Sequence, residues 1–169
     1  MNTSAQLYTL NYSELRTYYI SALFVLANII LPQLCHLIPQ GGIILAPLSL
    51  VILVGAYKFG WKVGLLAAVA SPVVNHLLFG APAPGVLQVM AMKLIVLALV
   101  AGMVAKHFGK VTILLLCAVV LLSELLGGLG ELALTGGIAA TVADFTIGLP
   151  GMLLQIILGY FLISTKLGI

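Results

Sequence analysis

The chain has 169 residues, of which 63% are hydrophobic and only 7% are charged. Soluble globular domains carry about 25% charged residues, so this composition excludes an ordinary water-soluble domain. The net charge of +3 comes from scattered basic residues and does not indicate nucleic-acid binding. Apolar runs recur along the whole chain at the length that membrane-spanning helices require. They predict a single integral membrane domain over residues 1–169.

The predicted fold class is an all-α membrane protein with six transmembrane helices. After a polar N-terminal stub (1–16), the spans cover about 17–37, 41–57, 62–79, 86–105, 111–131 and 143–164. The first break falls at Pro39 with Gly41 and Gly42. The other four breaks fall at "KFGWK" (58–62), "FGAPAPG" (79–85), "KHFGK" (106–110) and "GGLGELALTGG" (127–137). The N-terminus lacks the positively charged start of a signal peptide, so we expect the first helix to be retained.

Basic residues flank the predicted spans on one side only. Six of the seven lie in the N-terminal flank, in the second and fourth connections and at the C-terminus: Arg16, Lys58, Lys62, Lys106, Lys110 and Lys166. The first, third and fifth connections contain no lysine or arginine. Because positively charged flanks favour the cytoplasm, we expect both termini and the even connections to be cytoplasmic.

The seventh basic residue, Lys93, lies inside the fourth predicted span, roughly 10 Å below its outer end at about 1.5 Å per residue. Glu124 reaches a similar depth on the antiparallel fifth span, so we expect the two charges to pair. An isolated charge at the centre of a span costs about 2.5–3.5 kcal/mol on insertion scales. The pair would either tie two helices together or line a binding site, and the sequence leaves both interpretations open.

The other polar residues at membrane level lie toward the predicted outer side. They are Gln33, His36, Asn75, His76, Gln88, Glu131, Asp144 and Gln155. An ion pathway needs polar groups at several depths across the membrane, whereas this distribution predicts a cup that is open outward and sealed below. Apolar walls with a few placed polar groups suit a small-molecule site.

Several of these residues also have a purely structural interpretation. His76 could cap a helix end, and Asp144 could cap the start of the sixth span. The residues that we assign to packing are Met90, Met92, Met103, Met152, Cys35 and Cys117. No catalytic constellation, metal-ligand set or nucleotide-binding motif is recognisable, so we expect no enzyme activity, no cofactor and no bound metal. Any ATP hydrolysis would belong to another protein.

Residues 41–106 resemble the substrate-capture subunits, or S components, of energy-coupling factor transporters. The resemblance depends on "LVGAYKFGWKVGLLAA" (53–68) after a proline-containing second helix, and on the "SP…LLFGAP" corner from Ser71 to Pro82. "LPGMLLQIILGYFL" (149–162) is similar to the last helix of that family.

The resemblance implies six helices with both ends in the cytoplasm of a prokaryotic cell, and capture of a vitamin or related micronutrient from outside. It implies assembly with a membrane coupling subunit and two cytoplasmic ATPases. In the family, small residues on the first helix contact the coupling subunit, and the positions here are Ser21, Ala22 and Ala27. Ser49 corresponds to the family's polar residue after the proline of the second helix. The full set of expected substrate-binding residues is Gln33, His36, Ser49, Asn75, His76, Gln88, Lys93, Glu124, Asp144 and Gln155.

Two alternatives stay open at this point. A structural subunit of a larger membrane complex would use the same polar residues for helix contacts. The substrate could be a heterocyclic vitamin, or a tetrapyrrole such as haem or cobalamin ligated by His36, His76 or Cys35. An intramembrane enzyme is the weakest hypothesis, because the chain offers no plausible nucleophile or metal set.

Overall fold

The computed structural model of the chain describes residues 6–35, 37 and 46–165, and within them it contains helices and connections but no β-strand. The helices are α1 (Leu15–Cys35), α3 (Pro47–Phe59), α4 (Trp61–Phe79), α5 (Pro84–Phe108), α6 (Ile113–Thr135) and α7 (Ile138–Ser164). Five of them are long and apolar enough to cross a membrane, and α3 is a shorter apolar helix. The predicted all-α class is therefore confirmed in the described residues, and five of the six helices have the length and composition of membrane spans.

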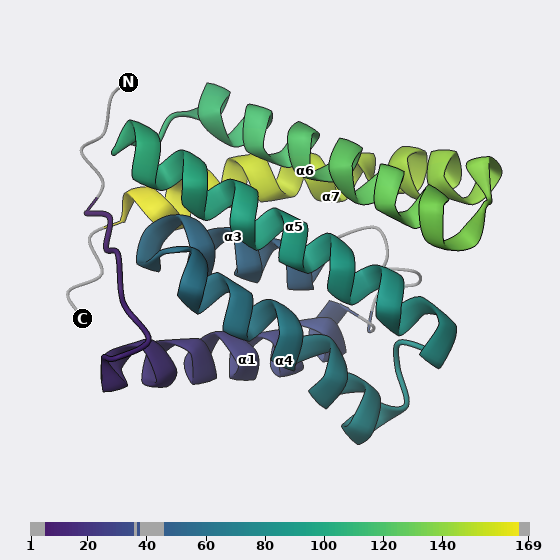
Figure 1. The fold of residues 1–169 in the computed structure, drawn as a ribbon, viewed down its shortest axis with the longest axis horizontal. Helices are drawn as coiled ribbons and strands as arrows, with labels where there is room; N and C mark the ends of the chain where they lie inside the picture. The colour runs from purple at the N-terminus through teal and green to yellow at the C-terminus, as the bar shows by residue number, and fades with distance from the viewer. Residues whose placement is uncertain (1–5, 36, 38–45, 166–169) are drawn as a thin grey trace.

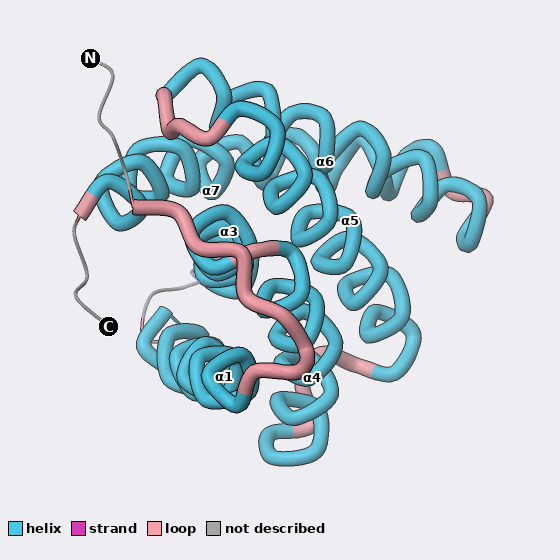
Figure 2. The backbone as a smooth tube through the Cα atoms, turned by 60° about the vertical axis from the view of Figure 1, so that its left-hand side comes forward, coloured by secondary structure: helices cyan, strands magenta, loops and turns pink. Residues whose placement is uncertain are grey.

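The helix α3 lies at the centre of the bundle, and the other helices surround it (Figure 2). It packs against α1, α4, α5 and α7, while α6 packs against α5 and α7. Residues 50–60 are all buried, which explains why this segment is apolar on every side. The outer helices direct many large apolar side chains away from the bundle, as expected for surfaces solvated by lipid.

Consecutive helices run in opposite directions, so one end of the bundle collects the beginning of α1 and the end of α7 (Figure 1). Lys58 lies at this end and is buried. Its ammonium donates hydrogen bonds to the backbone oxygens of Leu162 and Thr165, where α7 ends, and the backbone oxygen of Lys58 accepts a bond from Tyr8 N at 2.7 Å. Lys58 therefore joins the two ends of the described chain instead of standing free as a flanking charge.

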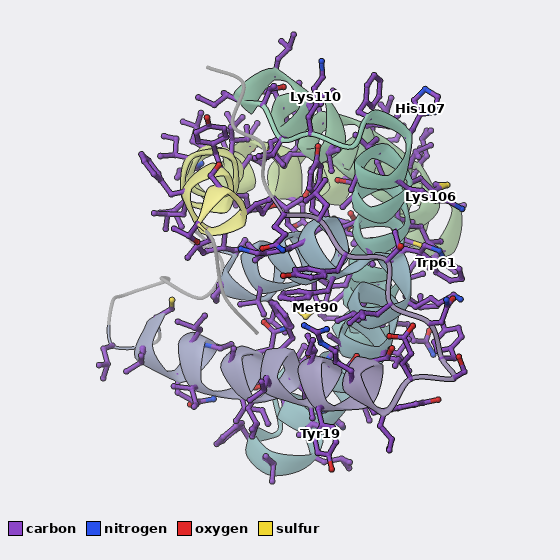
Figure 3. All side chains as sticks on the ribbon, turned by 90° about the vertical axis from the view of Figure 1, so that its left-hand side faces the viewer. Tyr19, Trp61, Met90, Lys106, His107 and Lys110 are labelled. Carbon is purple, nitrogen blue, oxygen red and sulfur yellow. The ribbon has the colours of Figure 1, made fainter. Side chains whose placement is uncertain are left out.

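The basic residues at this end otherwise face outward. Viewed along the bundle from this end, Lys106, His107 and Lys110 lie at the periphery, whereas Met90 lies among the helices (Figure 3). The predicted polar stub before α1 packs onto the bundle in its described part. Leu10 is buried in a small cluster with Ile20, Phe59 and Val63. Alternate side chains of this segment are apolar, which permits the contact.

Most of the predicted connection at 127–137 is helical, so this prediction is wrong over that part. The helix α6 continues to Thr135, and the turn contains only Gly136 and Gly137, with Gly136 in the left-handed conformation at φ 68°. Gly127, Gly128 and Gly130 lie within the helix, where glycine serves close packing instead of ending the helix.

Candidate functional site

A cavity of about 300 Å³ lies between α3, α5, α6 and α7, toward the end of the bundle opposite the basic residues. The beginning of α3 supplies Leu48 and Ser49 to one end of the cavity, together with Ala46 just before the helix.

The walls of the cavity follow helical periodicity. From α5 they include Val86, Val89, Met90, Lys93, Leu94 and Leu97. From α7 they include Asp144, Gly148, Met152 and Gln155, which are spaced by four, four and three residues and so form one stripe. Asp144 and Gln155 therefore lie on one face of α7. Asp144 does not cap the helix, because α7 begins six residues earlier at Ile138.

Lys93 makes two ion pairs. Its ammonium lies 2.6 Å from Glu131 Oε2 on α6 and 2.9 Å from Asp144 Oδ2 on α7. The side chain of Glu131 is 8% exposed, so Lys93 supplies the partner that this buried carboxylate needs. One lysine from α5 thereby connects three helices near the mouth of the cavity.

The predicted ion pair between Lys93 and Glu124 is wrong, because no contact within 4.0 Å joins the two charges, both of which are described. The reason is the direction of helical side chains, which lean toward the N-terminus of their helix. The side chains of α5 therefore lean toward the cavity mouth. The side chains of α6, which runs antiparallel to α5, lean away from the cavity mouth. Lys93 therefore reaches outward to Glu131, about two turns beyond Glu124, the partner expected from depth alone.

The glycines of α6 make room for this lysine. A Cβ atom on Gly127 would lie 3.0 Å from Lys93 Cγ, and one on Gly128 would lie 3.1 Å from Thr141 Cγ2 of α7. The stem of Lys93 runs past Gly127, and its ammonium meets Glu131 one turn further along α6. Without a side chain at position 127, α5 and α6 can approach closely enough for this contact.

Three polar side chains of the cavity have no hydrogen bond or ion pair with any described residue. They are Ser49 on α3, Glu124 on α6 and Gln155 on α7. Gln155 is 2% exposed. A buried amide without a partner is costly, so its position on a cavity wall marks a place where a ligand would supply the missing bonds.

Asn75 and His76 serve the fold and do not line the cavity. Asn75 Nδ2 donates to the backbone oxygens of Asn28, at 2.9 Å, and Ser71, at 2.8 Å. Asn28 Nδ2 in turn donates to Ser71 Oγ at 2.9 Å, which completes a buried contact between α1 and α4. His76 Nδ1 lies 2.8 Å from the backbone oxygen of Pro82 and holds the corner after α4, in agreement with its structural interpretation.

The remaining predicted residues also lie away from the cavity or outside the described residues. Gln33 and Gln88 are exposed and absent from its walls. Gln88 is off the face of α5 that carries Lys93, because the cavity positions of this helix are separated by three or four residues. His36 lies outside the described residues.

The proposed docking residues of α1 divide into two kinds. Ser21 is buried, and its hydroxyl donates to Thr17 O at 2.7 Å. It faces the bundle and is closed to a partner protein, so its assignment to a docking surface is wrong. Ala22 is exposed and Ala27 is half-buried.

A second hollow, of about 490 Å³, lies between the outer parts of α6 and α7. It shares Lys93 and Glu124 with the cavity, and its other walls are mostly apolar, including Leu125, Leu129 and Phe145. The two hollows therefore meet at the charged residues. Within the described chain, no group of three or more His, Cys, Asp or Glu side chains is arranged to hold a metal ion.

Comparison of the chain with protein families, with curated proteins and with solved structures finds no match. The site is therefore interpreted from its own chemistry. The sequence placed Glu131 among the polar residues of the outer side, but Glu131 was not included among the expected site residues. Its seven-residue spacing from Glu124, which puts the two acids on one side of the helix, was the available signal. Ser123, Gly127 and Gly148 were missed, because small residues in an apolar run carry little signal of a site.

Proposed function

We propose that this chain is the substrate-binding subunit of a membrane importer of the energy-coupling factor type, and that it captures a vitamin or related micronutrient from outside the cell. The observation that carries the proposal is the cavity at one end of the bundle. It has apolar walls, a fixed ion-pair cluster at its mouth and unpartnered polar groups inside. Apolar walls with a few oriented polar groups are typical of small-molecule sites.

The size and lining of the cavity favour a ligand of one or two rings. About 300 Å³ is at the lower limit of the usual range for small-molecule sites, which runs to about 1,000 Å³. Neither Cys35 nor His76, two of the three residues considered for ligating a tetrapyrrole metal, lines the cavity. A heterocyclic vitamin is therefore the better candidate.

The distribution of charge supports an orientation with both termini in the cytoplasm of a prokaryotic cell. Described basic residues other than Lys93 gather at the end of the bundle opposite the cavity, namely Arg16, Lys58, Lys62, Lys106 and Lys110. By the positive-inside tendency this end would be cytoplasmic, and the cavity would open to the exterior. All six helices would then lie in the membrane, with α3 held at the bundle axis.

Transport would require partner proteins, because the chain has no recognisable nucleotide-binding motif. In this proposal a membrane coupling subunit and two cytoplasmic ATPases supply the energy. The exposed face of α1 at Ala22, with Ala27 beside it, is the proposed contact with the coupling subunit, because small residues permit close helix approach.

The proposal is tested by binding. The full chain, purified in mild detergent, is analysed by native mass spectrometry for co-purifying small molecules, then stripped and offered a mixture of water-soluble vitamins. We expect one vitamin to bind, and Gln155→Leu to weaken its affinity at least tenfold, while the remote control Lys106→Met leaves it unchanged. Failure of every vitamin to bind, together with no co-purifying ligand, would favour the alternative of a structural subunit.

A further inference from the structure

The charges around the cavity do not cancel. Three carboxylates, from Glu124, Glu131 and Asp144, surround the single ammonium of Lys93. The other described basic residues lie at the opposite end of the bundle, outside the cavity wall. With these groups ionised, the site carries an excess of two negative charges.

Lys93 is not available as the recognition group for an anion. Its ammonium donates a charge-assisted hydrogen bond to Asp144 Oδ2 at 2.9 Å and forms an ion pair with Glu131 Oε2 at 2.6 Å. An anionic ligand would have to displace one of these carboxylates and then face the other acids. Lys93 is therefore poorly placed to receive an anionic group of a ligand.

Glu124, unlike Lys93, is not held by a charged partner in the described part of the chain. It lines the cavity, it is half-buried, and it has no hydrogen bond or ion pair with any described residue. Next to it in the same cavity lie the free hydroxyl of Ser49 and the free amide of Gln155, which is 2% exposed. A carboxylate at this depth is costly without a counter-charge, and a bound cation would supply one.

We propose that the cavity binds a small organic cation, such as an amine, an amidinium or a cationic nitrogen heterocycle, with its positive group against Glu124. Ser49 and Gln155 then bond the polar edge of the ligand, and the apolar faces of Met90, Leu97 and Met152 contact its ring. Lys93 is a positioning residue, which holds Glu131 and Asp144 at the mouth. This inference rests on the proposed function and specifies the substrate class of that site.

The test uses three probes of nearly equal shape and different charge: benzamidinium, benzamide and benzoate. Each is titrated onto the stripped full chain in detergent, and binding is followed by thermal shift and by ligand-observed NMR. We expect benzamidinium to bind at least tenfold more tightly than benzamide, and benzoate to bind more weakly than both. We expect Glu124→Gln to remove the preference for benzamidinium, since it keeps the shape of the side chain and removes its charge.

Glu14→Gln is the matched control, because it makes the same change at the other end of the molecule, where Glu14 accepts a hydrogen bond from Asn11 N. It should leave all three affinities unchanged. A second variant, Ser49→Ala, removes one hydroxyl from the cavity and should weaken benzamidinium binding severalfold with little risk to folding. Equal binding of the three probes, or a benzamidinium preference that survives Glu124→Gln, overturns the inference.

The vitamin mixture separates this inference from the proposed function. Binding of a neutral or anionic vitamin, unaffected by Glu124→Gln, overturns the assignment of a cation and leaves the proposed function intact. Binding of a cationic vitamin that is lost in Glu124→Gln supports both. Absence of all vitamin binding overturns the proposed function, and the three probes alone then decide whether the cavity binds a cation.

Discussion

Lys93 and Glu124 show how two charges at similar depth can have separate roles. Lys93 lies 2.9 Å from Asp144, which is 57% exposed, and also contacts Glu131, whose side chain is 8% exposed. Glu124 stays in the cavity without an ion pair among the described residues. At the scale of single residues, the first group connects helices, and the second is the group that we propose a ligand contacts.

We expect Lys93→Met to destabilise the protein. Removal of the ammonium leaves Glu131 buried without its counter-charge, and such changes cost about 3–5 kcal/mol when both partners are buried. Because Asp144 is more than half exposed, we expect a smaller loss here, of about 1–3 kcal/mol. Thermal unfolding in detergent measures the change.

The double variant Lys93→Met with Glu131→Gln gives the necessary comparison. It removes the uncompensated charge together with its partner, so it should recover part of the lost stability. Lys106→Met is the control for loss of a lysine at an exposed position, and it should change stability by no more than about 0.5 kcal/mol. A double variant as unstable as Lys93→Met would show that the pair is not the cause.

At the scale of helices, the glycines of α6 decide how closely α5 and α6 pack. Gly127 faces the stem of Lys93, whereas a Cβ atom at Gly85 in the first turn of α5 would meet nothing within 4 Å. Both glycines have helical backbones, so the two positions differ mainly in the space around them.

We therefore expect opposite effects from two Gly→Ala substitutions. In open space this change stabilises a helix by up to about 1 kcal/mol, so Gly85→Ala should raise the melting temperature. At Gly127 the new Cβ would lie 3.0 Å from Lys93 Cγ, so Gly127→Ala should give no gain or a loss. Melting curves of the two variants, measured side by side, provide the check, and equal gains would contradict the packing argument.

The end of α7 depends on a lysine from α3. Lys58 donates to the backbone oxygens of Leu162 and Thr165, two carbonyl groups where α7 ends. A cation near a helix C-terminus also interacts favourably with the helix dipole. We expect Lys58→Met to cost about 1–3 kcal/mol, because it leaves these oxygens without their donor, and to increase hydrogen exchange in the last turn of α7. Unchanged exchange in that turn would contradict this role.

The sequence predicted the helices more successfully than the site. Helix ends at "KFGWK" and "KHFGK" coincide with glycines and charges, which an apolar helix cannot continue through cheaply. The rule that glycines mark a helix end failed at 127–130, where the glycines lie inside α6 and provide contact surface. Composition alone cannot separate these two uses, because both depend on the absence of a side chain.

The sequence also predicted only part of the site. Ser49, Lys93, Glu124, Asp144 and Gln155 do line the cavity. The depth of a residue along a span can be counted from the sequence. This count correctly placed the five residues toward the same end of the bundle. Which face of a helix looks inward depends on the neighbouring helices, and Gln33 and Gln88 do not line the cavity.

At the scale of the whole molecule, the two ends of the bundle differ in chemistry. Basic side chains such as Lys62, Lys106 and Lys110 lie at one end, and the acids Glu124, Glu131 and Asp144 lie toward the other. Between them, the central part of α3 and its neighbours form a buried apolar core. An apolar core between the two ends of the described bundle fits the proposed capture of a ligand from one side better than conduction of ions.

The proposed orientation gives a prediction about access to the two ends. In a variant with Cys35→Ser and Cys117→Ala, single cysteines are placed at Ala81, an exposed residue of the α4–α5 corner, or at Lys110, an exposed residue of the α5–α6 turn. A membrane-impermeant maleimide added to intact cells should label the Ala81→Cys protein, because positive-inside orientation places this corner outside. Lys110→Cys should react only after the cells are permeabilised. Labelling of Lys110→Cys alone in intact cells would invert the protein, place the cavity on the cytoplasmic side and rule out capture of a ligand from outside.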